Sequence, residues 1–363
     1  MNNEGLKKTA IYAGVFGFIT IGAMLYRAGT KHIIIADAAM DIIHDEASEN
    51  AYDLSAINDT DKTVAGTFVI PLPSDVSSTS ITLDDRYSDH ELLIYIDSRD
   101  VSYYHSNSIR YNDVPLTSAE CVPLNEHGDV CLRFGLNGLY ENTIEMSEGE
   151  LTVTVQSPDE VYDNIVVIDP RYGGDEIGNT NGDLLEKDIN IQLASYIKEE
   201  LDKTDNIRAY VTRLGDTTVS EDERLLFIEE SGADFILQIK TESDDGQGLY
   251  GVSAYYNNVY YIRDFGNAEF ADMIFINAVS GLDVKGAGVM PESRDNTIIS
   301  SSVIPSASIS AGYIDSVVDK ENLADETYLK QVAKGVADGI IKSFEEISTE
   351  SDSSTDVAAI TGE

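Results

Sequence analysis

The polar residues best placed to do chemistry lie in one stretch, Ile165 to Asn190, which reads IVVIDPRYGGDEIGNTNGDLLEKDIN. Its first four residues are apolar and β-branched, which is typical of a buried strand. Asp169-Pro170 and Gly173-Gly174 end that strand in a turn, and a polar loop follows from Asp175 to Asp183. In open α/β sheets, sites are built at the carboxyl ends of the strands, so we expect one at this loop.

The elements that must position this loop alternate between strands and helices from Val161 to about Ile347. That alternation predicts an α/β fold with a mostly parallel sheet flanked by helices. One helix follows the loop, because apolar residues recur at helical spacing from Ile189 to Leu201. Another begins at the capping pair Ser220 and Glu223 and ends at Gly232. Further strands are expected at Arg208–Thr212, Phe235–Ile239, Tyr250–Tyr256 and Val303–Ile309, and further helices at Glu269–Val279 and Leu329–Phe344.

This order of motifs resembles that of the zinc-dependent N-acetylmuramoyl-L-alanine amidases, which cut the stem peptide from peptidoglycan. The Asp-Pro and Gly-Gly pairs resemble the first motif of that family, and Leu184 to Asp188 resembles its Leu-x-Glu-Lys-Asp motif. The resemblance covers roughly Ile165 to Phe344 and implies the same α/β fold. Its other landmarks are Val211-Thr212-Arg213, Asp216, Arg224, Gly232-Ala233-Asp234 and the strand that starts at Phe235.

The resemblance also implies which positions would hold and use a metal ion. The family binds zinc through a His, a Glu and a second His, and these positions are Tyr172, Glu186 and Lys240 here. The catalytic Glu of the family corresponds to Ser310. An ammonium cannot ligate zinc, and a serine is a poor general base, so only Glu186 retains its role. We therefore expect no zinc or other cofactor and favour a protein that is not an enzyme.

These four residues are candidates for lining a substrate groove, and they leave several hypotheses open. In one, Lys240 and Glu186 form a metal-free ion pair, and the Tyr172 hydroxyl donates a hydrogen bond to the same carboxylate. In another, the positions have drifted because nothing constrains them. A nucleophile pair of Ser310 and Lys240 would be a third, but no oxyanion-hole signature accompanies it.

The composition limits the partners of the protein. Its 363 residues contain 24 Lys plus Arg against 65 Asp plus Glu, which gives a formal net charge of -41. Nucleic-acid binding depends on basic patches, so this charge argues against it. The length suffices for two modest domains with tails.

The apolar run at 9–26 predicts a transmembrane anchor, because it carries no charge and approaches the ~20 residues of a spanning helix. Lys7 and Lys8 precede it and favour a cytoplasmic stub at 1–8. The protein would then be a single-pass membrane protein whose C-terminal part lies outside the cytoplasm. A cleaved signal peptide is the alternative. Residues 27–64 are expected to be a juxtamembrane spacer.

Between residues 65 and 160 the periodicity changes to two, which predicts a small antiparallel β-domain similar to a sandwich. Cys121 and Cys131 flank turn signals in this segment, so a hairpin would bring them within disulfide range. Two unpaired thiols are the alternative. The amidase-like domain is assigned to 161–347, and 348–363 is expected to be an acidic, disordered tail. The five expected strands of the β-domain are Thr67–Ile70, Ser80–Leu83, Leu92–Ile96, Val130–Phe134 and Leu151–Val155.

Taken together, these features predict a membrane-anchored, amidase-like protein of the cell envelope with a non-catalytic binding or regulatory role. Its expected partners are peptidoglycan or its stem peptides, the membrane, and a protein of the envelope. The alternative is an active N-acetylmuramoyl-L-alanine amidase with a remodelled site. A structural spacer is a third possibility.

Overall fold

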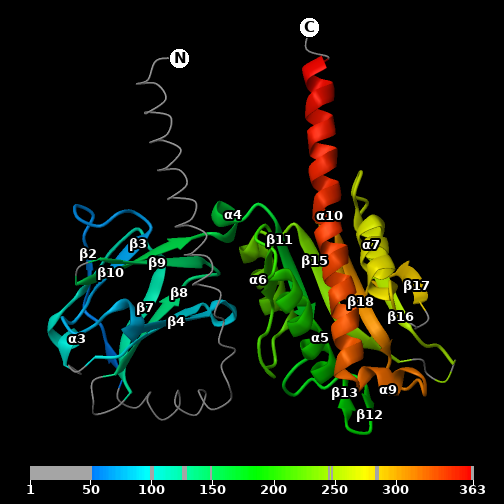
Figure 1. Ribbon diagram of the computed structural model, residues 1–363, viewed down its shortest axis with the longest axis horizontal. Helices are drawn as coiled ribbons and strands as arrows, with labels where there is room; N and C mark the ends of the chain where they lie inside the picture. Colours follow the sequence, from blue (N-terminus) through cyan, green and yellow to red (C-terminus); the bar gives the residue numbers. More distant parts are fainter. Residues whose placement is uncertain are drawn as a thin grey trace, which may run out of the picture.

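The computed structural model describes residues 51–98, 102–124, 129–147, 149–243, 246, 248–282 and 286–360. They form two parts that lie side by side, a β-sandwich and an α/β part (Figure 1). The predicted stub and anchor at 1–26 lie outside the described residues, as does the spacer up to residue 50. Within the described residues, no helix combines the length and the apolar character needed to cross a membrane.

Two five-stranded sheets make up the first part. All five strands that the sequence predicts here are present. Alternate residues of each strand point inward, and Phe68, Ile94, Phe134 and Val153 meet in a core between the sheets. In strand order, one sheet is β1 (Tyr52–Asp53), β7 (Leu116–Pro123), β8 (Val130–Leu136), β5 (Glu91–Ile96) and β4 (Ile81–Arg86). The other is β2 (Ala56–Asn58), β6 (Ile109–Asn112), β3 (Thr67–Pro71), β10 (Glu150–Gln156) and β9 (Glu141–Ser147).

The sandwich begins earlier in the chain than expected. Strands β1 and β2 fall in the segment that the sequence analysis assigns to a spacer, and they pair with β7 and β6. Their backbone hydrogen bonds make them edge strands of the two sheets. Their two or three residues are too few to show a period in the sequence.

The predicted disulfide between Cys121 and Cys131 is wrong, because both cysteines are free and buried. Cys121 lies opposite Leu132, and Cys131 lies opposite Val122, in the antiparallel ladder of β7 and β8. The two cysteines are therefore one step out of register. Neighbouring positions of a strand face opposite sides of a sheet, so the two thiols point away from each other.

The second part is built on a six-stranded sheet in the order β14 (Arg208–Val211), β11 (Ile165–Pro170), β15 (Phe235–Glu242), β18 (Ser306–Tyr313), β16 (Val252–Tyr256) and β17 (Gly286–Pro291). The first four strands are parallel, and β16 runs antiparallel to β18. The mostly parallel sheet agrees with the prediction. The carboxyl ends of β11, β15 and β18 therefore lie at one edge of the sheet.

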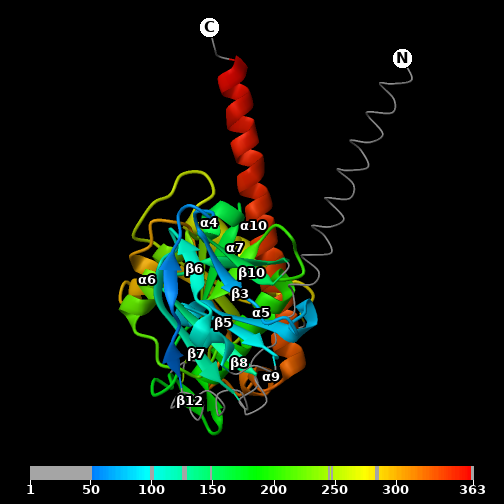
Figure 2. The ribbon, with the colours of Figure 1, turned by 90° about the vertical axis from the view of Figure 1, so that its left-hand side faces the viewer.

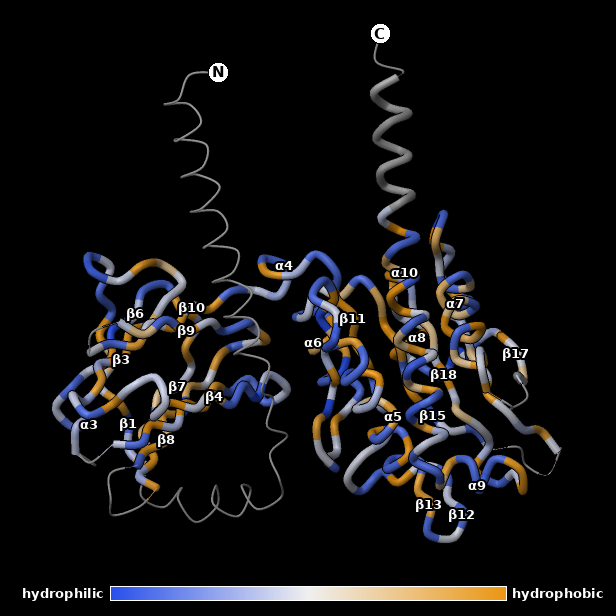
Figure 3. The backbone as a smooth tube through the Cα atoms, in the orientation of Figure 1, coloured by the Kyte–Doolittle hydropathy of each residue, from blue (hydrophilic) through white to orange (hydrophobic). Residues whose placement is uncertain are grey.

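Helices cover both faces of this sheet. The helices α5 (Glu186–Leu201), α7 (Asn267–Val279) and α10 (Glu326–Ile360) pack on one face and enclose the larger core. The helix α6 (Glu221–Ser231) and the short α8 (Thr297–Ser300) lie on the other face. In Figure 3 the strands carry much of the hydrophobic colour, whereas many connecting loops are hydrophilic. The predicted cap of α6 is confirmed, because Gly232 follows it with a φ of 62°.

Helix α10 differs from its prediction at its end. It continues to Ile360 and projects beyond the sheet (Figures 1 and 2), where the sequence analysis expects a tail without structure. Residues 348–360 contain no proline or glycine, so no residue there breaks the helix. Shorter elements complete the described chain: the helices α3 (Tyr103–Ser106), α4 (Pro158–Val161) and α9 (Asp319–Leu323), and the hairpin of β12 (Thr180–Asn181) and β13 (Leu184–Leu185).

The two parts meet in a small hydrophobic cluster. Tyr87 and Leu139 of the sandwich pack with Val167, Tyr210 and Phe227 of the α/β part. Polar contacts surround this cluster. The Arg208 guanidinium lies 2.6 Å from a Glu141 carboxylate oxygen, and the Tyr87 hydroxyl accepts a hydrogen bond from the Val211 amide.

Candidate functional site

The site begins at a buried carboxylate at the end of β11. Asp169 is fully buried and pairs with the Arg224 guanidinium. Its two oxygens also accept hydrogen bonds from the Thr212 hydroxyl at 2.6 Å and the Gln238 amide at 2.8 Å. The same arginine donates to the Tyr172 carbonyl at 3.2 Å. Asp169 and Arg224 thus fix the start of the loop over the carboxyl edge.

Close backbone packing holds the next part of this loop. A Cβ atom on Gly173 would lie 2.2 Å from the Thr217 carbonyl oxygen, so only glycine fits there. The Gly174 amide donates to Asp216 at 2.8 Å, and Lys187 pairs with the same carboxylate at 2.7 Å. This bridge joins the loop to the first turn of α5.

Glu186 starts α5 and is 1% exposed. One carboxylate oxygen accepts from the Asn179 amide at 2.9 Å, and the other accepts from the Thr241 amide at 3.0 Å. Burial raises the pKa of Glu186, and these two N–H donors oppose the rise. The carboxylate therefore uses both oxygens to join the loop to the end of β15.

Tyr172 lies beside Glu186 but does not hydrogen-bond to it, so the predicted hydroxyl contact is wrong. Its backbone is left-handed, with a φ of 65°. Its ring packs against Gly178, where an added Cβ would lie 2.6 Å from a ring carbon and 2.7 Å from a Glu186 oxygen. The Arg171 guanidinium lies 4.9 Å from the centre of the same ring. The Tyr172 ring thus lies close to both Gly178 and the Arg171 guanidinium.

Lys240 does not pair with Glu186, so the predicted metal-free ion pair is wrong. Its ammonium lies 2.7 Å from Glu242 and 3.1 Å from Glu292, and 3.5 Å from the centre of the Tyr255 ring. The physical reason is strand alternation. Thr241 contacts α5 through Asn190, so the preceding residue of β15 points to the other face.

Glu292, which pairs with Lys240, is a residue of the site that the sequence does not predict. It follows β17 and is 7% exposed. Its carboxylate also accepts from the Ser308 hydroxyl and from the Ser293 amide, the latter at 2.9 Å. Burial raises its pKa, but the Lys240 ammonium and these donors outweigh burial and leave the pKa below its usual range. Nothing in the sequence near Glu292 distinguishes it from other acidic loop residues.

Ser310 is fully buried in β18 and lies opposite Lys240 in the parallel ladder with β15. Its hydroxyl donates to the Gly312 carbonyl at 2.7 Å and accepts from the Glu242 amide at 3.2 Å. The predicted nucleophile pair of Ser310 and Lys240 is therefore wrong, because the hydroxyl makes its bonds to the backbone. The four candidate residues do gather at the carboxyl edge of the sheet, as the sequence predicts.

The residues at this edge do not fit a zinc ion. A hydrolytic zinc site needs three protein ligands and an open position for water. Here both Glu186 oxygens are bonded to backbone amides, and the Lys240 position carries an ammonium held by two carboxylates. Within the described residues, no group of three His, Cys, Asp or Glu side chains has an arrangement that could hold a metal ion.

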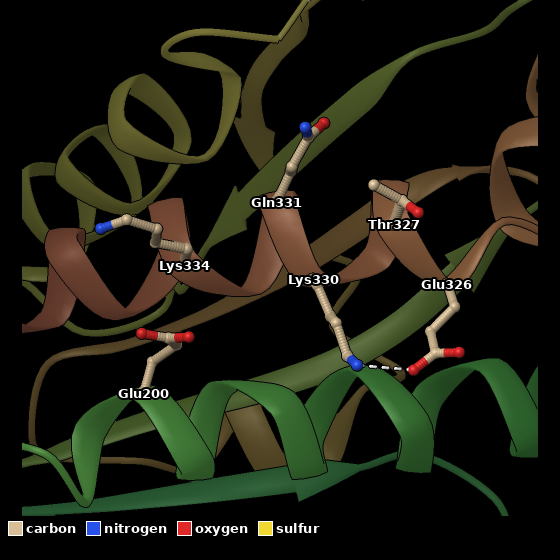
Figure 4. Close-up of a pocket in the computed structure, with 6 residues that line it drawn as sticks. All are labelled: Glu200, Glu326, Thr327, Lys330, Gln331 and Lys334. Carbon is tan, nitrogen blue, oxygen red and sulfur yellow. Dashed lines mark ion pairs between the residues drawn. The ribbon is translucent and has the colours of Figure 1, made fainter.

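A separate hollow lies between α5 and α10 (Figure 4). Glu200 lines it from α5, and Lys330 lines it from α10 with its ammonium 2.6 Å from Glu326. The Lys330 and Glu326 side chains are more than half exposed. Glu200 lies roughly 21 Å along α5 from Glu186 by the usual rise of a helix. This hollow is therefore distinct from the candidate site.

Comparison with known proteins points to one family. Residues 166–342 match the model of the N-acetylmuramoyl-L-alanine amidase family. The sporulation-specific N-acetylmuramoyl-L-alanine amidase of Bacillus subtilis is 25% identical over 182 residues, which cover 49% of this chain and 68% of that protein. The amidase LytC of the same organism is 24% identical over 192 residues, or 53% of this chain and 38% of LytC.

Solved structures of similar proteins include two amidases. The N-acetylmuramoyl-L-alanine amidase AmiC2 of Nostoc punctiforme is 26% identical, with a TM-score of 0.46, and the match covers 50% of this chain and 97% of AmiC2. The N-acetylmuramoyl-L-alanine amidase of Clostridium difficile 630 is 25% identical, with a TM-score of 0.47, and the match covers 50% of this chain and 97% of that protein.

Proposed function

The α/β part of the chain, residues 166–342, belongs to the N-acetylmuramoyl-L-alanine amidase family, and from this premise we propose that the protein binds peptidoglycan without hydrolysing it. The sandwich and the α/β part would act together in the cell envelope. The bound group would be the stem peptide, held at the carboxyl edge of the sheet.

One observation carries this proposal: the buried Lys240 ammonium, held between Glu242 and Glu292. The resemblance to the family predicts a neutral zinc ligand at the position of Lys240. A fixed positive charge repels a metal cation, and losing Lys240 would leave Glu292 buried without its counter-charge. The Lys240 ammonium thus already has two carboxylate partners within the protein.

Among the residues that the structure describes, the candidate site also lacks a side chain that could transfer a proton during hydrolysis. Proton transfer needs a side chain with a suitable pKa within hydrogen-bond reach of the reacting atoms. Ser310 takes the place of the family's catalytic Glu, and its hydroxyl is bonded to the Gly312 carbonyl. Glu186 has both oxygens bonded to amides. Neither residue is poised to move a proton to a leaving group.

The location of the protein is part of the same proposal. The apolar run at 9–26 would anchor it in the cell membrane, with the sandwich and α/β part outside the cytoplasm. A folded part of this size would then reach the wall from the membrane surface. An envelope protein that docks on the same site is a further candidate partner.

The test uses the purified full chain in detergent. We expect it to sediment with insoluble peptidoglycan, to release no stem peptides with or without added zinc, and to retain no stoichiometric zinc by elemental analysis. Release of stem peptides that Glu186→Ala abolishes would establish an active amidase instead. A chain that stays in the supernatant would support a structural spacer.

A further inference from the structure

The backbone of Arg171 is fixed by hydrogen bonds beside the candidate site. Its amide donates to the Ile239 carbonyl at 2.9 Å, which extends the ladder between β11 and β15 by one residue. Its carbonyl accepts from the Asn190 side chain at 3.1 Å. The backbone of Arg171 is therefore tied to β15 and α5 at once, and its side chain leaves from a rigid point.

The Arg171 guanidinium has no anionic partner. Within the described residues it makes neither an ion pair nor a side-chain hydrogen bond, and it lies 4.9 Å from the centre of the Tyr172 ring. By contrast, Arg224 pairs with Asp169, and Arg213 donates to three backbone carbonyls. An uncommitted arginine is unexpected in a chain with a net charge of -41.

Two features prepare this guanidinium for a ligand. Stacking on an aromatic ring restricts the side chain while leaving its N–H donors available. Arg171 lies near enough to Glu186 to lower the pKa of that carboxyl through space, but the Glu186 oxygens accept hydrogen bonds from the Asn179 and Thr241 amides. The donors of Arg171 thus remain for a group that arrives from solvent.

We propose that Arg171 binds a carboxylate of the peptide ligand, with Tyr172 orienting the guanidinium. A planar guanidinium and a carboxylate can form two parallel hydrogen bonds, which gives geometric selectivity as well as affinity. This inference rests on the proposed function, because it identifies the group that the site recognises on a peptidoglycan stem peptide. It assigns a binding role to a residue that the family resemblance leaves without one.

The test is calorimetric titration of the full chain with peptides released from purified peptidoglycan. A second titration uses the same peptides after amidation of their carboxylates. We expect the amidated peptides to bind on the order of tenfold more weakly to the wild-type chain. We expect Arg171→Gln to weaken binding of the untreated peptides by a similar factor, and Arg171→Lys to weaken it less.

Arg263→Gln is the matched control, because it removes the same charge from an exposed loop after β16. That loop lies at the opposite edge of the sheet, since β16 runs antiparallel to β18. Equal affinity of Arg171→Gln and wild type, or no preference for the untreated peptides, would overturn the inference. Sedimentation with insoluble peptidoglycan would still report on the proposed function separately.

Discussion

At the scale of single residues, a charged cluster at the carboxyl edge of the sheet joins the Lys240 ammonium to the Glu242 and Glu292 carboxylates. Lys240 is 6% exposed, and its partner Glu292 is 7% exposed. Buried ion pairs of this kind gain little over apolar residues, but breaking one leaves a charge without compensation. A single substitution in this cluster should therefore lower the stability of the folded protein.

We expect Lys240→Met to lower the free energy of unfolding by about 3–5 kcal/mol, because it leaves the Glu292 carboxylate buried and unpaired. The double variant Lys240→Met/Glu292→Met should recover part of this loss. Urea unfolding followed by circular dichroism measures both.

Lys334→Met serves as the control for this comparison. Its ammonium is exposed and lies 3.6 Å from Asp338, so the substitution should change stability by less than about 0.5 kcal/mol. If Lys240→Met lowers the free energy of unfolding by no more than Lys334→Met does, the buried pair does not stabilise the fold as expected.

The sequence predicts where the candidate residues gather but not what they contact. The resemblance to the amidase family singles out Tyr172, Glu186, Lys240 and Ser310, and the order of the parallel strands places them at one edge. Their contacts depend on which face of the strand each side chain points to, and on residues that are far away in the sequence. Glu292 lies 52 residues from Lys240, and no local pattern marks it.

At the scale of elements, the long periodic segments are predicted well. The strands β11, β14, β15, β16 and β18 and the helices α5, α6 and α7 occur where apolar periodicity places them, and α10 begins there but continues to Ile360. Strand β17 has the sequence Gly-Ala-Gly-Val-Met-Pro, whose glycines and proline are typical of a loop. Its pairing with β16 comes from tertiary contact, which the local sequence does not encode.

The packing of α10 on α7 gives an element-scale prediction. An added Cβ on Gly335 would lie 2.3 Å from the Asn277 carbonyl oxygen, so the glycine permits the helices to approach closely. In an isolated helix, Gly→Ala gains about 1 kcal/mol. Here we expect Gly335→Ala to lose roughly 1–3 kcal/mol instead, because the backbone must shift.

The melting temperatures of the separate variants Gly335→Ala and Asp338→Ala, each compared with wild type, measure this effect. Asp338 lies on the same helix with its side chain 48% exposed, so its substitution tests helix propensity without the close contact. A higher melting temperature for Gly335→Ala would show that the helices can move apart at no cost.

At the scale of the whole molecule, a partly buried acidic group, Asp85, lies near the contact between the sandwich and the α/β part. Burial, and next the Glu141 carboxylate, raise the pKa of Asp85 to about 7. The Arg208 guanidinium and the Asn142 amide oppose this rise. Because Arg208 belongs to β14 and Glu141 to β9, the ionisation of Asp85 is linked to the contact between the two parts.

We expect Asp85 to make the folded protein less stable as the pH rises from about 4 to about 7. In this window the unfolded chain releases the Asp85 proton while the folded chain keeps it, so the free energy of unfolding falls. Asp85→Asn removes this dependence. Its stability relative to wild type should therefore increase from pH 4 to pH 8.

Urea unfolding at several pH values measures the difference between Asp85→Asn and wild type. Asp159→Asn is a suitable control, because Asp159 is exposed on α4. A difference that stays constant with pH would mean that Asp85 ionises in the folded protein as it does in the unfolded chain.

The short strand β1 has a mechanical consequence. It joins its sheet through two register pairs, Tyr52 with Cys121 and Asp53 with Glu120, whereas β7 and β8 share a ladder several times longer. Tension applied to the chain ahead of Tyr52 would load these two pairs first. β1 would peel away before the rest of its sheet yields, so a pull on the chain ahead of Tyr52 would lengthen that segment while leaving the α/β part intact.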